Sequence, residues 1–156
     1  MVEIKSAFKV VVVENPTIKP IYLSVLPSNQ RIYSVRLWYW DGPFFLYRSL
    51  TAARQFAQSL LPRCSHLAIF EAECMPLEPQ PKYFPAWFST AIERLKWRGL
   101  VVEDVRAADH YLIQTGIAEP VGESEILAIA FRLVGEPVEE IVKQGGESYG
   151  VQKLYR

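Results

Sequence analysis

The sequence contains few of the residues on which metal sites and disulfide frameworks depend. Its 156 residues include only two cysteines, Cys64 and Cys74, and two histidines, His66 and His110. A zinc site needs three or four Cys, His or carboxylate ligands, and neither histidine is spaced to share a site with a second ligand. We therefore expect no metal site, and we expect two reduced cysteines in an intracellular, cytoplasmic protein.

Phosphate-binding loops and membrane spans are missing as well. Neither GxGxxG nor GxxxxGK[ST] occurs among the eight glycines, so no cofactor held by a standard nucleotide loop is expected. No apolar run reaches the roughly 18 residues that a membrane-spanning helix needs. The apolar block at residues 10–13 is too short for a signal peptide. The sequence thus predicts a protein with no cofactor and no membrane association.

The chain has no net charge, but its charges are unevenly distributed. Residues 1–100 carry twelve Lys and Arg against seven Asp and Glu, whereas residues 101–156 carry five against ten. This asymmetry fits either a basic binding face or two halves that attract each other. Because phosphate neutralisation dominates affinity for nucleic acid, zero net charge favours a protein partner over nucleic acid.

Hydrophobic residues, in contrast, make up 50% of the chain and aromatic residues 13%, which indicates a folded domain. Apolar runs bounded by Pro, Asn and Asp predict strands at 7–13, 20–26, 31–40, 43–48, 66–74, 100–105 and 110–117. Helical spacing of apolar residues predicts helices at 50–61, 85–98 and 124–144. Residues 124–134 also fit a strand, but Ser124 can cap a helix, which favours the helix.

The order of these elements predicts the fold class. Strands come first and helices are interspersed later, which is typical of an α+β fold with a mainly antiparallel sheet and two to three packed helices. We expect one domain over residues 1–144, followed by a polar C-terminal tail at residues 145–156.

Residues 31–48 predict a β-hairpin with Asp41-Gly42 as its two-residue turn. In that register Trp38 faces Phe45 and Arg36 faces Tyr47. One face of the hairpin then carries Arg36, Trp38, Trp40, Phe45 and Tyr47. Since neither face is polar, the hairpin is either covered on both sides or offers one aromatic face to a partner.

The helix expected at 85–98 adds a second candidate surface. Its core stripe is expected to consist of Phe88, Ala91, Ile92 and Leu95. Trp97 lies off that stripe, beside Arg94 and Arg98, where it can anchor a protein or nucleic-acid partner. The alternative is that a following segment covers Trp97.

These two surfaces lead to the main functional hypothesis. Aromatic and arginine side chains are the commonest anchors of protein interfaces, and they also stack on unpaired bases. We expect a small non-enzymatic binding or regulatory module that recognises a macromolecule, either a protein partner or a second copy of itself. Nucleic acid is the alternative partner.

A second hypothesis starts from Glu71 and Glu73, which lie on one face of the strand at 66–74, about 7 Å apart. Two such carboxylates can divide the roles of acid and base. In chain order, Arg36, Ser49-Leu50-Thr51 and Glu71-Ala72-Glu73 resemble the strand Arg, Ser/Thr-containing strand and Glu-x-Glu motif of ADP-ribosyltransferases. The resemblance implies an enzyme that uses Glu71, Glu73 and Arg36.

A third hypothesis concerns residues 89–115. This segment resembles the helix and wing of winged-helix DNA-binding domains, in which a helix ends in Arg-Gly-Leu and leads into a hairpin. The resemblance implies DNA binding, with Arg94, Lys96 and Arg98 near phosphates or base edges.

Overall fold

The computed structural model describes residues 3–25, 31–143 and 149–153, the last of these by its backbone alone. In chain order the elements are β1 (Lys5–Glu14), β2 (Ile21–Leu23), β3 (Ile32–Tyr33), β4 (Phe44–Tyr47), α1 (Leu50–Leu60), β5 (His66–Pro76), β6 (Tyr83–Pro85), α2 (Ala91–Glu103), α3 (Val105–Gln114), β7 (Ala118–Pro120), β8 (Glu125–Lys143) and β9 (Tyr149–Lys153). The predicted α+β class with a mainly antiparallel sheet is confirmed.

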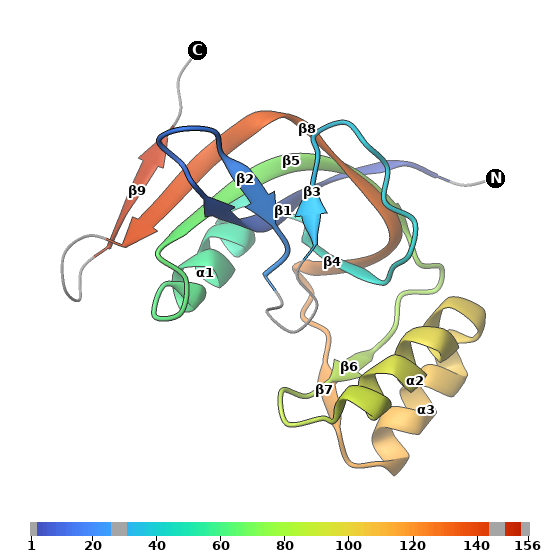
Figure 1. Ribbon diagram of the computed structural model, residues 1–156. Helices are drawn as coiled ribbons and strands as arrows, with labels where there is room; N and C mark the ends of the chain where they lie inside the picture. The colour runs from blue at the N-terminus through green and yellow to red at the C-terminus, as the bar shows by residue number, and fades with distance from the viewer. Residues whose placement is uncertain (1–2, 26–30, 144–148, 154–156) are drawn as a thin grey trace.

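The main sheet closes on itself. Its order is β3-β2-β1-β4-β8-β5, and β1 also pairs with β5, so that β1, β4, β8 and β5 surround a common interior (Figure 1). β8 is long enough to pair with β4 at its start and with β5 and β9 further along. The register between β5 and β8 shifts at two irregularities, which let the long strands bend around the interior.

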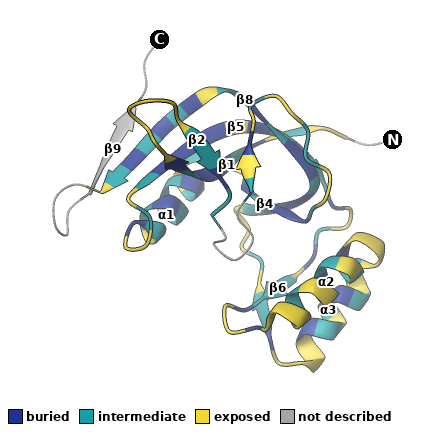
Figure 2. Ribbon diagram, viewed as in Figure 1, coloured by how far each residue is buried: buried dark blue, intermediate teal, exposed yellow. Residues whose placement is uncertain are grey.

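Most of the buried apolar residues, whose positions Figure 2 shows along the ribbon, belong to three clusters. The first fills the interior of the closed sheet around Phe70 and Phe131. The second lies between the outside of the sheet and α1, where Tyr47 stacks on Phe56. The third is centred on Trp97 and lies in the lobe formed by α2, α3 and the two-stranded β6–β7 sheet, and it reaches the closed sheet through Leu127 of β8 and Phe45 of β4.

The lobe is attached to the closed sheet through β8. The side chain of Gln80 donates to the carbonyl oxygens of Leu77 (2.7 Å) and Leu127 (2.8 Å), and it accepts from the Leu127 amide (2.8 Å). Phe45 of β4 contacts Phe84 of β6 edge to face, with ring centroids 5.4 Å apart. These contacts fix where α2 lies relative to the sheet.

The predicted hairpin at residues 31–48 is wrong. β3 pairs with β2, and β4 pairs with β8. The amides of Arg36, Tyr39 and Gly42 donate to carbonyl oxygens of Leu133, Phe131 and Ile129. The segment therefore runs in one direction along β8.

Gly42 explains this course. A Cβ at Gly42 would lie 2.6 Å from the carbonyl oxygen of Ala128, so only a glycine allows the chain to approach β8 this closely. Asp41-Gly42 consequently docks on β8 and does not close a two-residue turn.

The helix predicted at 124–144 is also wrong, because these residues form β8. The segment is rich in β-branched and aromatic residues, and much of it is buried on both faces. A strand covered on both sides shows no regular alternation, so the sequence pattern did not separate it from a helix. Gly135, with φ of 68°, lies within the strand, where the register between β5 and β8 shifts.

The strands predicted at 100–105 and 110–117 are helical instead. α2 continues through Gly99 to Glu103, and Asp104 caps α3 by accepting from the amide of Ala107 (3.2 Å). Leu100-Val101-Val102 favours a strand by local propensity, but packing of Val101 against α3 outweighs that preference.

The boundaries of the remaining elements differ less from expectation. The strands at 7–13, 43–48 and 66–74 and the helix at 50–61 are present, and Ser49 caps α1 as predicted. Of the strand predicted at 20–26, only Ile21–Leu23 forms among the described residues, and residue 26 lies outside them. The helix predicted at 85–98 begins at Ala91, because Pro85 belongs to β6. Within the predicted tail at 145–156, residues 149–153 pair with β8, and the rest lies outside the described residues.

Candidate interaction surface

The described part of the chain contains neither a metal-binding cluster nor a membrane-spanning helix. No group of three or more His, Cys, Asp and Glu could hold a metal ion there, and no described helix is long and apolar enough to cross a membrane. A depression of about 240 Å³ lies beside the end of α2, lined by residues 77–79 and 101–106.

The start of α2 is fixed by side-chain hydrogen bonds. Thr90 accepts from the amide of Glu93 (3.1 Å), and the Glu93 carboxylate accepts from the amide of Thr90 (2.8 Å), which is a capping box. Arg94 donates to the carbonyl oxygen of Trp87 (2.7 Å) and to the hydroxyl of buried Ser89 (2.9 Å). The backbone that carries Trp87 and Phe88 is therefore held in place ahead of the helix.

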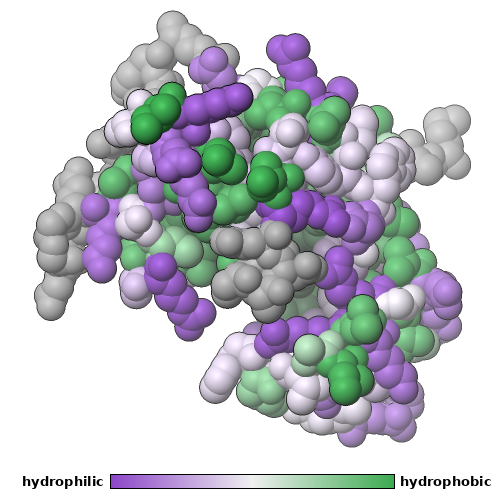
Figure 3. Space-filling view, viewed as in Figure 1, coloured by the Kyte–Doolittle hydropathy of each residue, from purple (hydrophilic) through white to green (hydrophobic). Residues whose placement is uncertain are grey.

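The outer side of α2 and the turn just before it carry exposed apolar side chains. Ile92 is 79% exposed, Leu95 72% and Trp87 82%, and Phe88 and Val102 are exposed as well. Figure 3 shows hydrophobic side chains gathered on the surface of this lobe. We call Trp87, Phe88, Ile92, Leu95 and Val102 the α2 surface. Large apolar side chains grouped in this way on one face are typical of an interaction site.

Gly99 lies within the α2 surface. It occupies the helix between Leu95 and Val102, and a Cβ built on it meets no atom within 4 Å. An alanine would fit there and would favour the helix by about 1 kcal/mol. No contact within the described residues therefore requires a glycine at this position.

Charged side chains flank the α2 surface on both sides. Lys96 and Glu103, which are exposed, border one side, and the Lys96 ammonium lies 4.9 Å from the ring centroid of Tyr111. Arg98 borders the other side and donates to the carbonyl oxygen of Asp41 (3.1 Å). The apolar stripe thus has a polar rim, as protein interfaces usually do.

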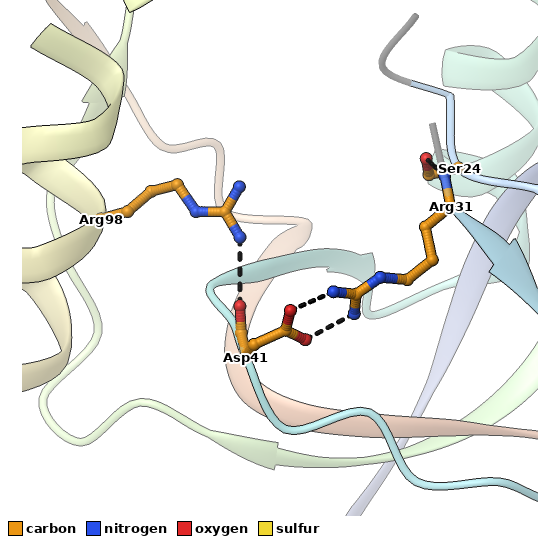
Figure 4. Close-up of polar contacts among 4 residues, drawn as sticks. All are labelled: Ser24, Arg31, Asp41 and Arg98. Atoms are coloured by element: carbon orange, nitrogen blue, oxygen red, sulfur yellow. Dashed lines mark hydrogen bonds and ion pairs between the residues drawn. The ribbon is translucent and has the colours of Figure 1, made fainter. Parts of the chain in front are cut away.

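Asp41 joins this helix to the closed sheet (Figure 4). Its carboxylate accepts a bidentate pair of hydrogen bonds from Arg31, while its carbonyl oxygen accepts from Arg98. The hydrogen bond from Arg31 lowers the pKa of Asp41. Arg98 of α2 consequently lies beside the loop that carries Trp40.

That loop forms a smaller aromatic surface of its own. Trp40 is 56% exposed, and its ring centroid lies 5.7 Å from that of half-buried Trp38. The guanidinium of Arg132 lies 5.3 Å from the Trp38 ring and is ion-paired with Glu73. Leu37 and Arg36 on the same loop are exposed.

The structure separates the residues that the hairpin interpretation grouped together. Trp38 and Trp40 lie outside the closed sheet with Arg36, but Tyr47 is buried under α1 and Phe45 packs against the lobe. The expected alternation holds for residues 38–40 and 44–47, but Arg36 and Leu37 are both exposed, and the five residues do not share one exposed face.

The assignment of core and surface on α2 is the reverse of the expected one. Trp97 is only 3% exposed and packs in the lobe core with Val101, while Ile92 and Leu95 face outward. α2 carries two apolar stripes, and α3 with the β6–β7 sheet covers the one that contains Trp97. Arg94 and Arg98 remain at the edge of the exposed stripe.

The residues that resemble ADP-ribosyltransferases are placed on three different kinds of element. Ser49 caps α1, Arg36 lies on an exposed loop with φ of 76°, and Glu71 and Glu73 share the outer face of β5. Glu73 accepts from Arg132 (2.7 Å). In the segment that resembles a winged helix, residues 89–115 form two helices where a helix and wing were expected.

Lys9 is a buried charge that the sequence analysis did not single out. It points into the closed sheet, where its ammonium donates to the carbonyl oxygen of Phe45 (2.9 Å) and lies 5.3 Å from the Phe131 ring centroid. Burial lowers the pKa of Lys9 to about 8. The alternation of Lys9 with Ala7 and Val11 in a strand could have indicated this position.

Two sequence signals for the α2 surface were present but not used. Thr90-Ala91-Ile92-Glu93 is the capping-box pattern that sets the helix start. Ile92, Leu95, Gly99 and Val102 follow one another in steps of three, four and three, the spacing of a helix–helix seam. Comparison of the chain with protein-family models, with curated proteins and with solved structures finds no match.

Proposed function

We propose that this chain is a small non-enzymatic binding or regulatory module that recognises a protein partner through the α2 surface. The observation that carries the proposal is the exposure of Ile92 and Leu95 on a helix whose opposite side already packs in the lobe core. Burying such side chains against a partner is favourable by roughly 25 cal/mol per Å² of apolar area.

A protein is favoured over nucleic acid by the composition of this surface. Its centre is apolar, and its rim carries Glu103 as well as Lys96 and Arg98. Nucleic-acid sites instead present clustered cations that neutralise phosphates. Trp40 and Trp38 lie beyond Arg98 and provide further aromatic contact area for a large partner.

The state of the two cysteines is relevant to the cellular compartment of the protein. Cys64 and Cys74 are both free, and burial raises the pKa of the Cys74 thiol to about 11. A reduced, unreactive thiol in the core suits a reducing compartment. We accordingly place the protein in the cytoplasm as part of this proposal.

Site-specific photocrosslinking tests the proposal. A photoreactive phenylalanine analogue at Ile92, in an extract of the organism's own cells, is expected to capture a protein, whereas the analogue at exposed Gln55 of α1 is not. Excess unlabelled wild-type chain should compete for capture, and a Leu95→Glu chain should not. Capture that is lost on nuclease treatment, or equal capture at Ile92 and Gln55, would contradict a protein-binding role.

A further inference from the structure

We propose that the partner of the α2 surface is a second copy of this chain, and that the two α2 helices pair antiparallel. This inference rests on the proposed function and names the partner for that same surface. It follows from the spacing, size and charge of the exposed residues, each of which is self-complementary.

The side chains along the exposed side of α2 differ in size in a way that suits pairing with a second copy. Ile92, Leu95, Gly99 and Val102 are spaced by three, four and three residues, so they line one side of the helix. A twofold axis beside position 97 sets Ile92 against the partner's Val102 and Leu95 against the partner's Gly99. Each layer then joins a larger side chain to a smaller one, which favours close packing.

Gly99 supports this arrangement independently. The space above it is empty, and the helix forms despite the cost of a glycine in its interior. A small residue on a helix surface lets a second helix approach closely, and a leucine from that helix can occupy the space. In a symmetric pair, Leu95 of each copy lies over Gly99 of the other, so the space above both glycines is filled.

The charges on the rim complement each other in the same register. Lys96 and Glu103 are seven residues apart and therefore border the seam on the same side. In an antiparallel pair this side faces itself, so Lys96 lies beside the partner's Glu103 and Glu103 beside the partner's Lys96. On the other side Arg98 lies beside the partner's Ala91, which avoids contact between like charges.

The ends of the helix fit the same orientation. The exposed Trp87 and Phe88 precede α2, and the depression of about 240 Å³ lies beside its last turn. Antiparallel pairing brings these aromatic side chains to the end of the partner helix where that depression lies. Aromatic anchors that meet a pocket are the usual centres of binding energy in protein interfaces.

Sedimentation equilibrium of the purified chain tests self-association. The wild type and a Gln55→Glu control are expected to form a dimer as concentration rises, whereas Leu95→Glu remains a monomer with an unchanged circular dichroism spectrum. Leu95 is exposed in the single chain, so its substitution does not disturb folding. A wild-type chain that stays monomeric at the highest soluble concentration would overturn the inference.

Charge reversal tests the orientation. Lys96→Glu alone and Glu103→Lys alone are each expected to weaken the dimer by about tenfold or more, because each sets like charges side by side. The double variant Lys96→Glu/Glu103→Lys restores the two attractions and should return the dissociation constant to within a few-fold of the wild-type value. Single variants without effect, or a double variant without recovery, would overturn antiparallel pairing.

Gly99→Ala is expected to stabilise the monomer and to weaken the dimer. In a Leu95→Glu background, where the chain is monomeric, alanine is expected to raise the melting temperature because it favours the helix. In the wild-type background it is expected to weaken the dimer, because its methyl group occupies the space for the partner's Leu95. Unchanged or tighter dimerisation would show that Gly99 lies outside the contact.

The two proposals can fail separately. A chain that is monomeric when purified but still captures other proteins through Ile92 in the crosslinking experiment would retain the proposed function and lose the second copy as its partner. A chain that neither dimerises nor captures a protein would lose both.

Discussion

At the scale of single residues, Lys9 stands out because its charged side chain lies in the buried interior of the closed sheet. Its side chain is enclosed by the closed sheet, and no ion pair among the described residues includes it. One hydrogen bond to the Phe45 carbonyl and contact with the Phe131 ring replace its hydration. Removing a charge from water costs free energy unless it is paired, which is why the pKa of Lys9 falls to about 8.

The lowered pKa of Lys9 predicts how stability depends on pH. Between pH 8 and about 10.5 the unfolded chain binds this proton while the folded chain loses it, so the contribution of Lys9 to the free energy of unfolding rises with pH. Below pH 8 the cost of burying the charge is fully present. A Lys9→Met variant avoids that cost, and we expect it to be the more stable protein at pH 7.

Urea unfolding of both proteins across this range measures the effect. The advantage of Lys9→Met should shrink by up to about 3 kcal/mol as the pH rises from 8 to 10.5. Cys74, whose pKa is raised to about 11, and Tyr33, whose pKa is raised to about 12, oppose the trend. They are present in both proteins, so their effect cancels in the difference. A difference that does not change with pH would show that Lys9 is hydrated in the folded state.

At the scale of secondary-structure elements, α2 carries two apolar stripes. One, with Trp97 and Val101, packs in the lobe core, and the other, with Ile92 and Leu95, remains outside. Either stripe satisfies the periodicity of an amphipathic helix. The choice between them depends on α3 and the β6–β7 sheet, which arrive later in the chain.

This asymmetry predicts that truncating a buried side chain of α2 costs far more stability than truncating an exposed one. Trp97→Ala removes a buried aromatic side chain and should lower the free energy of unfolding by about 3–5 kcal/mol. Leu95→Ala, on the exposed stripe, should change it by less than about 0.5 kcal/mol. Denaturant titration at a concentration where the chain is monomeric compares the two.

Trp97→Phe is the matched control for that comparison. The indole Nε1 of Trp97 has no hydrogen-bond partner within the described part of the chain, so phenylalanine keeps most of the packing without losing a hydrogen bond. We expect it to cost less than Trp97→Ala. A large loss from Leu95→Ala would mean that the exposed stripe is covered in the folded monomer.

At the scale of the whole molecule, a few side-chain hydrogen bonds join the helical lobe to the closed sheet. Gln80 bridges the Leu77 and Leu127 backbones with three hydrogen bonds, and Arg98 reaches Asp41 from the other side. The Gln80 side chain holds the proline-rich segment against β8. This segment sets the position of the α2 surface relative to Trp40.

Gln80→Ala should therefore loosen the lobe more than the sheet. Unpaired backbone groups at Leu77 and Leu127 are expected to cost about 1–3 kcal/mol. Hydrogen exchange should accelerate in α2, α3 and the β6–β7 sheet, with little change in β1 and β5. Gln55→Ala on exposed α1 serves as the control. Equal acceleration throughout the chain would indicate that lobe and sheet unfold as one unit.

The sequence determined much of the local structure. Ser49 predicted the start of α1, and the apolar blocks around Val10 and Phe70 predicted β1 and β5. The alternation of residues 44–47 and of 66–74 correctly divided their side chains between the two faces of the sheet. These features depend on neighbours within a few residues, which the sequence alone specifies.

Other features were decided only by tertiary structure. Asp41-Gly42 has the composition of a turn, but β8, which lies more than eighty residues later, pairs with the chain on both sides of it. Burial on both faces of β8 removed the alternation that distinguishes a strand from a helix. Which stripe of α2 is buried likewise depends on segments distant in sequence. Local pattern thus specified the faces of the elements, and long-range packing decided which of those faces remain free to bind.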